Sequence, residues 1–242
     1  MPIKVTEVNA SDVLTIEALA HGRAGVHFLN WKLSSRPLSE RNNHSRATFV
    51  GSGLYALCFD NNLIYIGSFL GNEKGIANFS GDVVRSRWWT HIGAITARGN
   101  RVHIARTSLA ALVLNPGVEH VMVDGFLQAV DPEKLHKDDG NLSPLRRLQF
   151  AARHVNDFFA NNADPVQILK RFTYVYAQVH KIPMNLSGER LKICIEGAEQ
   201  RLIQRLAPKC NTTHAPQGMP AIQVNLNEVA EILRGELEQC CV

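Results

Sequence analysis

Two tyrosines stand at the ends of what the sequence predicts to be neighbouring strands. Gly53–Tyr55 (Gly-Leu-Tyr) opens the first run and Tyr65–Gly67 (Tyr-Ile-Gly) closes the second. A phenol has an ordinary pKa near 10, so it takes a proton from water only where nearby cations lower that pKa. Tyrosine also favours strands for packing reasons alone. The pair is therefore a candidate for proton transfer that needs charged partners.

Later segments supply both kinds of charge. Arg87 and His91 are four residues apart, which puts them on one face of a predicted helix. Glu199 precedes Leu202 and Ile203 by three and four residues, so it adjoins the buried face of another helix. A carboxylate beside a core is costly unless something pairs with it, and a metal ion or an arginine would do so. A solvated arginine, a boundary histidine and a surface glutamate remain the alternative reading.

In this order the three segments resemble the GIY-YIG nuclease family. The residues that carry the resemblance are Tyr55 and Tyr65 in the two motifs, Arg87 and His91 in the first helix, and Glu199 with the trailing Asn211. The resemblance covers about residues 50–97 and 170–212. It implies that these six residues are catalytic in a metal-dependent endonuclease that cleaves DNA.

Two features depart from the family pattern. Family members often carry a lysine directly after the second motif, where this chain has Ser68, and Lys74 in the longer loop that follows is the candidate replacement. Residues 98–169 stand where compact members have a short link, so they are an insertion.

The resemblance also implies roles. Glu199 is the expected ligand of one Mg²⁺ ion per site, with Mn²⁺ as a substitute, because a single carboxylate suits a magnesium ion that keeps most of its waters. Arg87 offers a planar fork to the phosphate. One tyrosine takes the proton of the attacking water, and we favour Tyr55. His91 relays a proton or contacts phosphate, and Asn211 holds the strand or metal region from behind.

The expected function is site-specific double-strand cleavage of restriction type. A mobility or repair endonuclease on the same core is an alternative, and a catalytically silent DNA-binding protein is an alternative of another class. Double-stranded DNA is the expected partner, and a palindromic site would imply a homodimer. The expected DNA contacts are Arg36, Arg41, Arg46, Lys74, Arg85, Arg98, Arg101 and Arg106, with Arg146, Arg147 and Arg153 as further arginines of the insertion. A solubilising scatter of arginines is the competing interpretation.

The elements that must position these residues follow from hydrophobic periodicity and turn signals. The pattern predicts helices near residues 11–20, 82–98, 106–114, 144–161 and 187–206, strands at 53–59, 63–67 and 172–179, and a last helix after Asn225. The fold class is therefore α+β, with a small three-stranded, mostly antiparallel sheet flanked by helices and a mainly helical insertion.

Four regions follow from this order. They are an N-terminal helix and basic loop (1–48), the nuclease core (49–97 and 170–214), the insertion (98–169) and a C-terminal helix (215–242).

Composition sets wide bounds. With 45% hydrophobic and 20% charged residues the chain is of the soluble globular class, and a net charge of +4 permits an anionic partner. Five cysteines without a paired spacing argue against a disulfide framework or a zinc site, so we expect a reducing compartment, the cytoplasm. No signal peptide and no membrane span are expected.

Overall fold

A computed structural model of the chain describes residues 2–21, 28–41, 48–71, 81–115, 117–135, 141–160, 163–180 and 187–239. The chain is α+β and divides into two compact units. The first comprises Met1–Val13, Ser35–Arg87 and Lys170–Val242, and the second comprises Leu14–Ser34 and Trp88–Leu169. Within the described residues, none of the helices is both long and apolar enough to cross a membrane.

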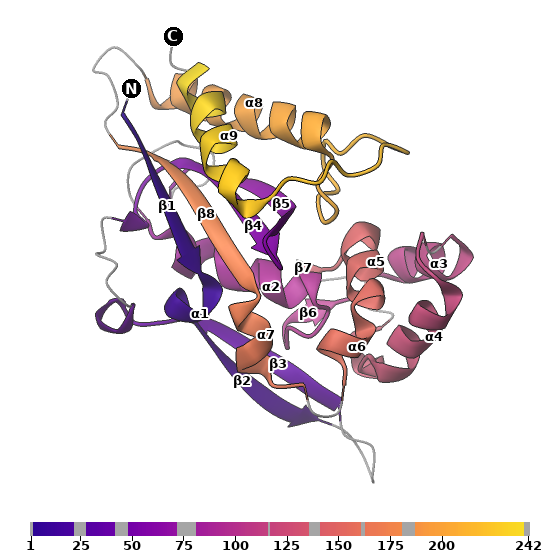
Figure 1. The fold of residues 1–242 in the computed structure, drawn as a ribbon. Helices are drawn as coiled ribbons and strands as arrows, with labels where there is room; N and C mark the ends of the chain where they lie inside the picture. The colour runs from indigo at the N-terminus through magenta and orange to yellow at the C-terminus, as the bar shows by residue number, and fades with distance from the viewer. Residues whose placement is uncertain are drawn as a thin grey trace. The chain divides into compact units, whose positions relative to one another are not determined.

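The first unit is built on a four-stranded antiparallel sheet in the order β1-β8-β4-β5 (Figure 1). The strands are β1 (Ile3–Asn9), β8 (Phe172–Val179), β4 (Gly53–Phe59) and β5 (Asn62–Phe69). The prediction of three strands is wrong by one, because β1 pairs with β8 along its whole length. Its first four residues, Ile-Lys-Val-Thr, alternate apolar and polar, but Glu7 and the buried Val8 break this alternation.

The β4–β5 hairpin lies where the sequence predicts it. Its turn residues Asp60 and Asn61 have φ values of 48° and 61°. Asp and Asn tolerate this left-handed region better than other non-glycine residues. Arg171 fixes the turn through two hydrogen bonds from its guanidinium to the Asp60 carboxylate, at 2.8 and 2.6 Å.

Two helices cover one face of this sheet, α8 (Gly188–Leu206) and α9 (Leu226–Gln239) (Figure 1). The Ser187 side chain caps α8 by accepting from the Arg190 amide at 3.3 Å, and the Asn225 amide donates to Glu228 at the start of α9. The apolar contacts join alternate residues of the strands to one stripe of each helix: Leu54, Ala56, Ile66, Val175, Ala177, Ile195, Leu202, Val229 and Leu233.

The predicted N-terminal helix is wrong. Only α1 (Ala10–Val13) is helical, and β2 (Leu14–His21) follows it directly and pairs with β3 (Phe28–Ser35). The apolar residues of this segment partly fit a helical face, yet they also alternate with Thr15 and Glu17, and β-branched residues favour strands. The basic loop that follows contains the short 3-10 helix η1 (Leu38–Glu40).

The second unit combines the β2–β3 ribbon with helices. These are α2 (Trp89–Ile95), α3 (Arg106–Leu114), α4 (His120–Ala129), α5 (Leu145–Arg153), α6 (Val155–Phe158) and α7 (Pro165–Lys170, whose last residue belongs to the first unit), with the 3-10 helix η4 (Pro132–Lys134) and the two-residue strands β6 (Val102–His103) and β7 (Asn141–Leu142). Helices α3 to α6 share an apolar core.

A buried lysine ties the turn after α2 to η4. The Lys134 side chain is 4% exposed, and its ammonium donates to the Gly99 and Ala97 carbonyls at 2.5 and 3.4 Å. Burial lowers the pKa of Lys134 to about 7, against the opposing influence of Asp131. The lysine therefore donates hydrogen bonds to two backbone carbonyls that follow the end of α2, where helical partners are lacking.

Candidate active site

The two predicted tyrosines lie on one face of the hairpin. Tyr55 pairs with Gly67 and Leu57 pairs with Tyr65, because the register shifts only after Leu57. The two phenol rings are 6.2 Å apart between centroids and tilted by 35°. Gly67 makes room for the first ring, since a Cβ there would lie 2.5 Å from the Tyr55 hydroxyl. The glycine of the second motif is thus required by the tyrosine of the first.

Tyr55 is the more enclosed of the two. It is 2% exposed, whereas Tyr65 is half-buried. Burial raises the pKa of Tyr55 well above its ordinary value, the nearby Tyr65 and Glu199 raise it further, and Arg87 acts in the opposite direction. These electrostatic contacts bring four of the six predicted residues into one neighbourhood of the first unit.

The Glu199 carboxylate contacts Ser68, the residue that departs from the family pattern of a lysine after the second motif. The Ser68 hydroxyl donates to Glu199 Oε2 at 2.5 Å. Burial raises the pKa of Glu199, while the hydrogen bond from Ser68 and the proximity of His214 lower it. Sequence reasoning missed both Ser68 and His214. The only signal for His214 was its position three residues after Asn211.

Asn211 acts on the backbone of the edge strand. Its amide donates to the Ile66 carbonyl at 2.7 Å and its side-chain oxygen accepts from the Ile66 amide at 2.9 Å. The Cys210 amide adds a bond to the Ile64 carbonyl at 2.9 Å. Asn211 is 3% exposed. It therefore fixes the segment between Tyr65 and Gly67 as a neighbouring strand would.

The predicted helix 82–98 is not a continuous α-helix. Asp82 caps its start by accepting from the Val84 amide at 2.9 Å, but η3 (Val84–Trp88) is π-helical and carries the exposed Arg87. A π-helix has a wider turn than an α-helix, so the four-residue spacing to His91 does not by itself fix a shared face. His91 is half-buried on α2 and belongs to the second unit.

Two predicted DNA contacts are buried, so the prediction that they face a duplex is wrong. Arg41 is 5% exposed and pairs with Asp82 at 2.6 Å. Arg98 is 6% exposed, donates to the Phe158 carbonyl at 2.6 Å and lies 4.9 Å over the Trp31 ring. Both guanidinium groups serve the interior of their own unit.

The other predicted contacts are distributed unevenly. Arg36 is half-buried and donates to the Ser11 carbonyl at 3.0 Å. Arg46 and Lys74 lie outside the described residues. The exposed members of the set are Arg85, Arg101, Arg106 and Arg153, and the half-buried ones are Arg146 and Arg147.

The carboxylate of Glu199 has the chemistry of a magnesium ligand. Within the described residues, no group of three or more His, Cys, Asp and Glu side chains could hold a metal ion. A half-buried carboxylate is nevertheless poorly solvated in its charged form, as the raised pKa of Glu199 indicates, and a cation would restore that stabilisation. Magnesium suits such a site because it keeps several waters and needs few protein ligands.

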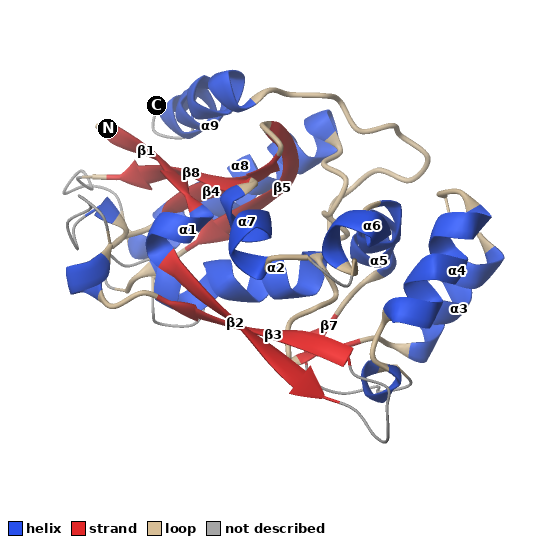
Figure 2. Cartoon of the chain, turned by 60° about the horizontal axis from the view of Figure 1, so that its bottom comes forward, coloured by secondary structure: helices blue, strands red, loops and turns tan. Residues whose placement is uncertain are grey.

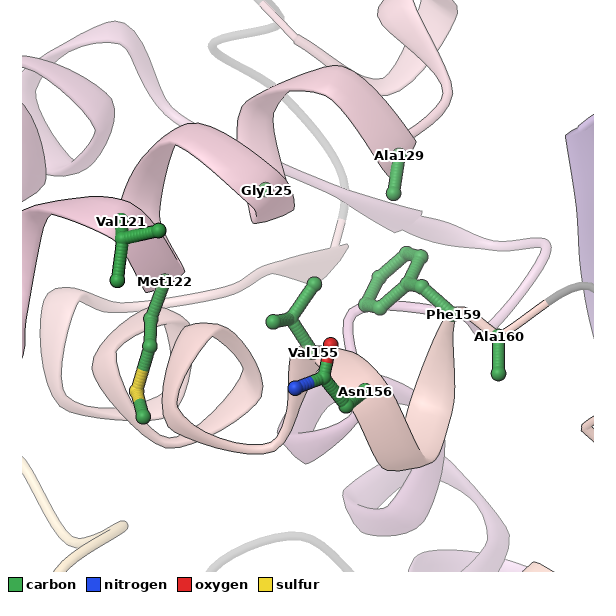
Figure 3. Close-up of a pocket in the computed structure, with 8 residues that line it drawn as sticks. All are labelled: Val121, Met122, Gly125, Ala129, Val155, Asn156, Phe159 and Ala160. Carbon is green, nitrogen blue, oxygen red and sulfur yellow. The ribbon is translucent and has the colours of Figure 1, made fainter.

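The second unit has a hollow of different chemistry. A groove of about 560 Å³ lies between α4 and α6, and Figure 3 shows Val121, Met122, Val155 and Phe159 among the side chains that line it. Asn156 is the one polar side chain among the eight residues drawn. The side chains of this lining include no titratable group for acid–base chemistry and no cation for binding phosphate.

No protein-family model, curated protein or solved structure matches this chain. The candidate active site therefore rests on the geometry and electrostatics of Tyr55, Tyr65, Ser68, Arg87 and Glu199.

Proposed function

We propose that this chain is a metal-dependent endonuclease that hydrolyses DNA phosphodiester bonds, with site-specific double-strand cleavage of restriction type. The observation that carries the proposal is the joint placement of two phenols, a guanidinium and a carboxylate in one unit. Phosphodiester hydrolysis needs a base near the attacking water, positive charge at the phosphate and a carboxylate that binds a cation. This set contains one candidate for each need.

Arg87 is the proposed phosphate ligand. Its side chain is exposed on η3, and its guanidinium stays charged at any working pH. A planar fork can bind two oxygens of one phosphate and oppose the charge that develops on them.

The two tyrosines divide the work on the attacking water. The raised pKa of the buried Tyr55 keeps its phenol protonated, so we assign it to orientation as a hydrogen-bond donor. This reverses the role that the sequence favoured for Tyr55. The half-buried Tyr65, on the same face, is the proposed base.

Glu199 is the proposed magnesium ligand, and the Ser68 hydroxyl fixes the orientation of its carboxylate. When bound, the metal would supply Lewis acidity and a site for a phosphate oxygen. A palindromic target would further call for a homodimer, because two-fold DNA symmetry is matched by two-fold protein symmetry.

Plasmid cleavage tests the proposal. Purified protein should nick and linearise supercoiled plasmid with Mg²⁺ and not with EDTA. Glu199→Gln should lower the rate by at least about 100-fold, the scale of losing one group that stabilises the transition state. Glu196→Gln is the matched control, since Glu196 is exposed on the same helix one turn earlier.

A second readout separates metal binding from folding. Mg²⁺ should raise the melting temperature of the wild type and of Glu196→Gln, and not that of Glu199→Gln, because a ligand stabilises only the state that binds it. Cleavage by Glu199→Gln at the wild-type rate would remove Glu199 from the site.

A catalytically silent DNA-binding protein is the alternative function of another class. Duplex binding without Mg²⁺-dependent nicking would establish that function in place of the nuclease.

A further inference from the structure

The β2–β3 ribbon buries Trp31 and Leu33 on one side. Its polar face, on the other side, is exposed at Glu17, Lys32 and Ser34 and ends at the buried Asn30, which donates to an Asp131 carboxylate oxygen at 2.8 Å. Trp31 and Leu33 point inward, where the Trp31 amide donates to the Arg98 carbonyl at 2.8 Å and Leu33 lies against Gly93. The residues between and beyond them, Lys32 and Ser34, are exposed. The two strands form a two-stranded sheet and cross in the view of Figure 2.

Two cross-strand pairs occupy the polar face. The hydroxyls of Thr15 and Ser34 share a hydrogen bond at 2.8 Å, and the Lys32 ammonium lies 3.2 Å from a Glu17 carboxylate oxygen. Both pairs fit one antiparallel register, because Glu17 lies two residues after Thr15 on β2 and Lys32 lies two residues before Ser34 on β3. The charged pair is open to solvent, with side chains 57% and 61% exposed.

The spacing of the two side-chain pairs along the strands fits the rise of a DNA duplex. The major groove of the duplex admits a two-stranded β-ribbon. Residues two apart on a strand are about 7 Å apart, and this distance is about two base-pair steps of about 3.4 Å. The two side-chain pairs could therefore meet two base pairs that are two steps apart.

The chemistry of the charged pair matches one base pair in particular. Guanine presents acceptors O6 and N7 in the major groove, which a lysine contacts, and cytosine presents an amino donor, which a glutamate accepts. An exposed ion pair contributes little stability, so Glu17 and Lys32 can exchange each other for base edges. Hydroxyls such as those of Thr15 and Ser34 can serve either base.

We propose that the polar face of the β2–β3 ribbon reads the major groove of double-stranded DNA, with Glu17 and Lys32 addressing a G·C base pair. The inference deepens the proposed function and rests on it for the choice of DNA as ligand. It places recognition on a strand pair instead of on the arginines of the loop or the insertion.

Binding selection tests the ribbon independently of cleavage. Duplexes with a randomised segment are selected with EDTA present by the wild type, Glu17→Gln and Lys32→Met, and the bound pools are sequenced. The wild type should enrich a motif with a G·C pair at a fixed position. Each variant should lose at least about tenfold of the preference at that one position and keep the rest of the motif.

The matched control is the exposed ion pair of Arg234 and Glu231 on α9, with side chains 39% and 70% exposed. Arg234→Met and Glu231→Gln should select the wild-type motif. Circular dichroism of all variants checks that each is folded.

Three outcomes would overturn the ribbon assignment. They are unchanged motifs in both ribbon variants, an equal loss of affinity for every sequence, which would make Lys32 a phosphate contact, and no duplex binding by the wild type. If the protein selects a motif through the ribbon but never nicks plasmid, the ribbon assignment is supported and the proposed nuclease activity is rejected.

Discussion

The two strand pairs around short connections, β4–β5 and β2–β3, differ in what surrounds them. Every residue of β4 is buried, and the Tyr55 ring fills the space above a glycine. The ribbon buries Trp31 and Leu33 and leaves Lys32 and Ser34 in solvent. The first pair holds Tyr55 by packing, and the second holds Lys32 and Ser34 through cross-strand contacts.

This difference separates two demands. Chemistry on one phosphate requires groups fixed to a fraction of an ångström, and packed interiors provide that rigidity. Reading a long duplex requires a surface that stays open and polar. Substitutions in the buried hairpin should therefore cost stability and activity together, whereas those on the ribbon should cost specificity alone.

The largest effect is expected for Gly67→Ala. The new Cβ would lie 2.5 Å from the Tyr55 hydroxyl, so the ring must move. We expect a loss of about 1–3 kcal/mol of unfolding free energy from overpacking, together with loss of cleavage. Urea unfolding and plasmid nicking measure the two.

Gly235→Ala is the control, because a Cβ there has open space within α9. It should stabilise by about 0.5–1 kcal/mol through helix propensity. A Gly67→Ala protein with wild-type stability and rate would show that the hairpin is not tightly packed.

Asn211→Ala comes next. The variant loses two buried hydrogen bonds to Ile66, each contributing about 1 kcal/mol, so we expect a loss of about 2 kcal/mol. Its exposed neighbour gives the control Thr212→Ala, which should change stability by no more than about 0.5 kcal/mol. Equal unfolding midpoints for the two variants would contradict a stabilising role for this clamp on β5, the two hydrogen bonds between the Asn211 side chain and the Ile66 backbone.

A pH dependence should come from the turn beneath the ribbon. The pKa of the folded Lys134 is about 7, below its ordinary value of 10.5, so between these two pH values the unfolded chain binds more protons. Stability should therefore rise with pH from about 7 upward, by at most about 1.4 kcal/mol per pH unit.

Lys134→Met should remove this rise, whereas Lys209→Met, at an exposed position, should keep it. Urea unfolding between pH 6 and 9 provides the test. An unchanged slope in Lys134→Met would assign the dependence to another group.

The smallest effect is expected on the ribbon itself. Glu17→Ala and Lys32→Ala remove an exposed ion pair, and such pairs contribute about 0–1 kcal/mol. Thermal unfolding of the double variant should fall within about 0.5 kcal/mol of the wild type. A larger loss would mean that the polar face is structural.

The sequence predicted the β4–β5 hairpin, β8 and α8 well, because their signals are local. An Asp-Asn turn, a run of β-prone residues and a serine cap each act within a few residues. It missed β1, whose alternation of apolar and polar residues breaks at Glu7 and Val8, and it took the segment of β2 for a helix. The apolar residues of the β2 segment partly fit the period of a helix and partly that of a strand. Pairing with β3, which comes later in the chain, decides between the two.

The candidate site divides in the same way. The six predicted residues came from motifs, but the contact between Ser68 and Glu199 joins positions 131 residues apart and has no local signature. The burial of Arg41 and Arg98 was equally invisible, since charge alone suggests a surface. Long-range packing decides which arginines face solvent, and composition does not report it.

The clamp on β5 has a further consequence for the behaviour of the protein in concentrated solution. An edge strand with open amides and carbonyls invites strands of other molecules to add to the sheet. At β5 the Cys210 amide and the Asn211 side chain already occupy Ile64 and Ile66 from the outer side. An incoming strand therefore cannot pair with these backbone groups of Ile64 and Ile66, which disfavours aggregation through this edge of the sheet.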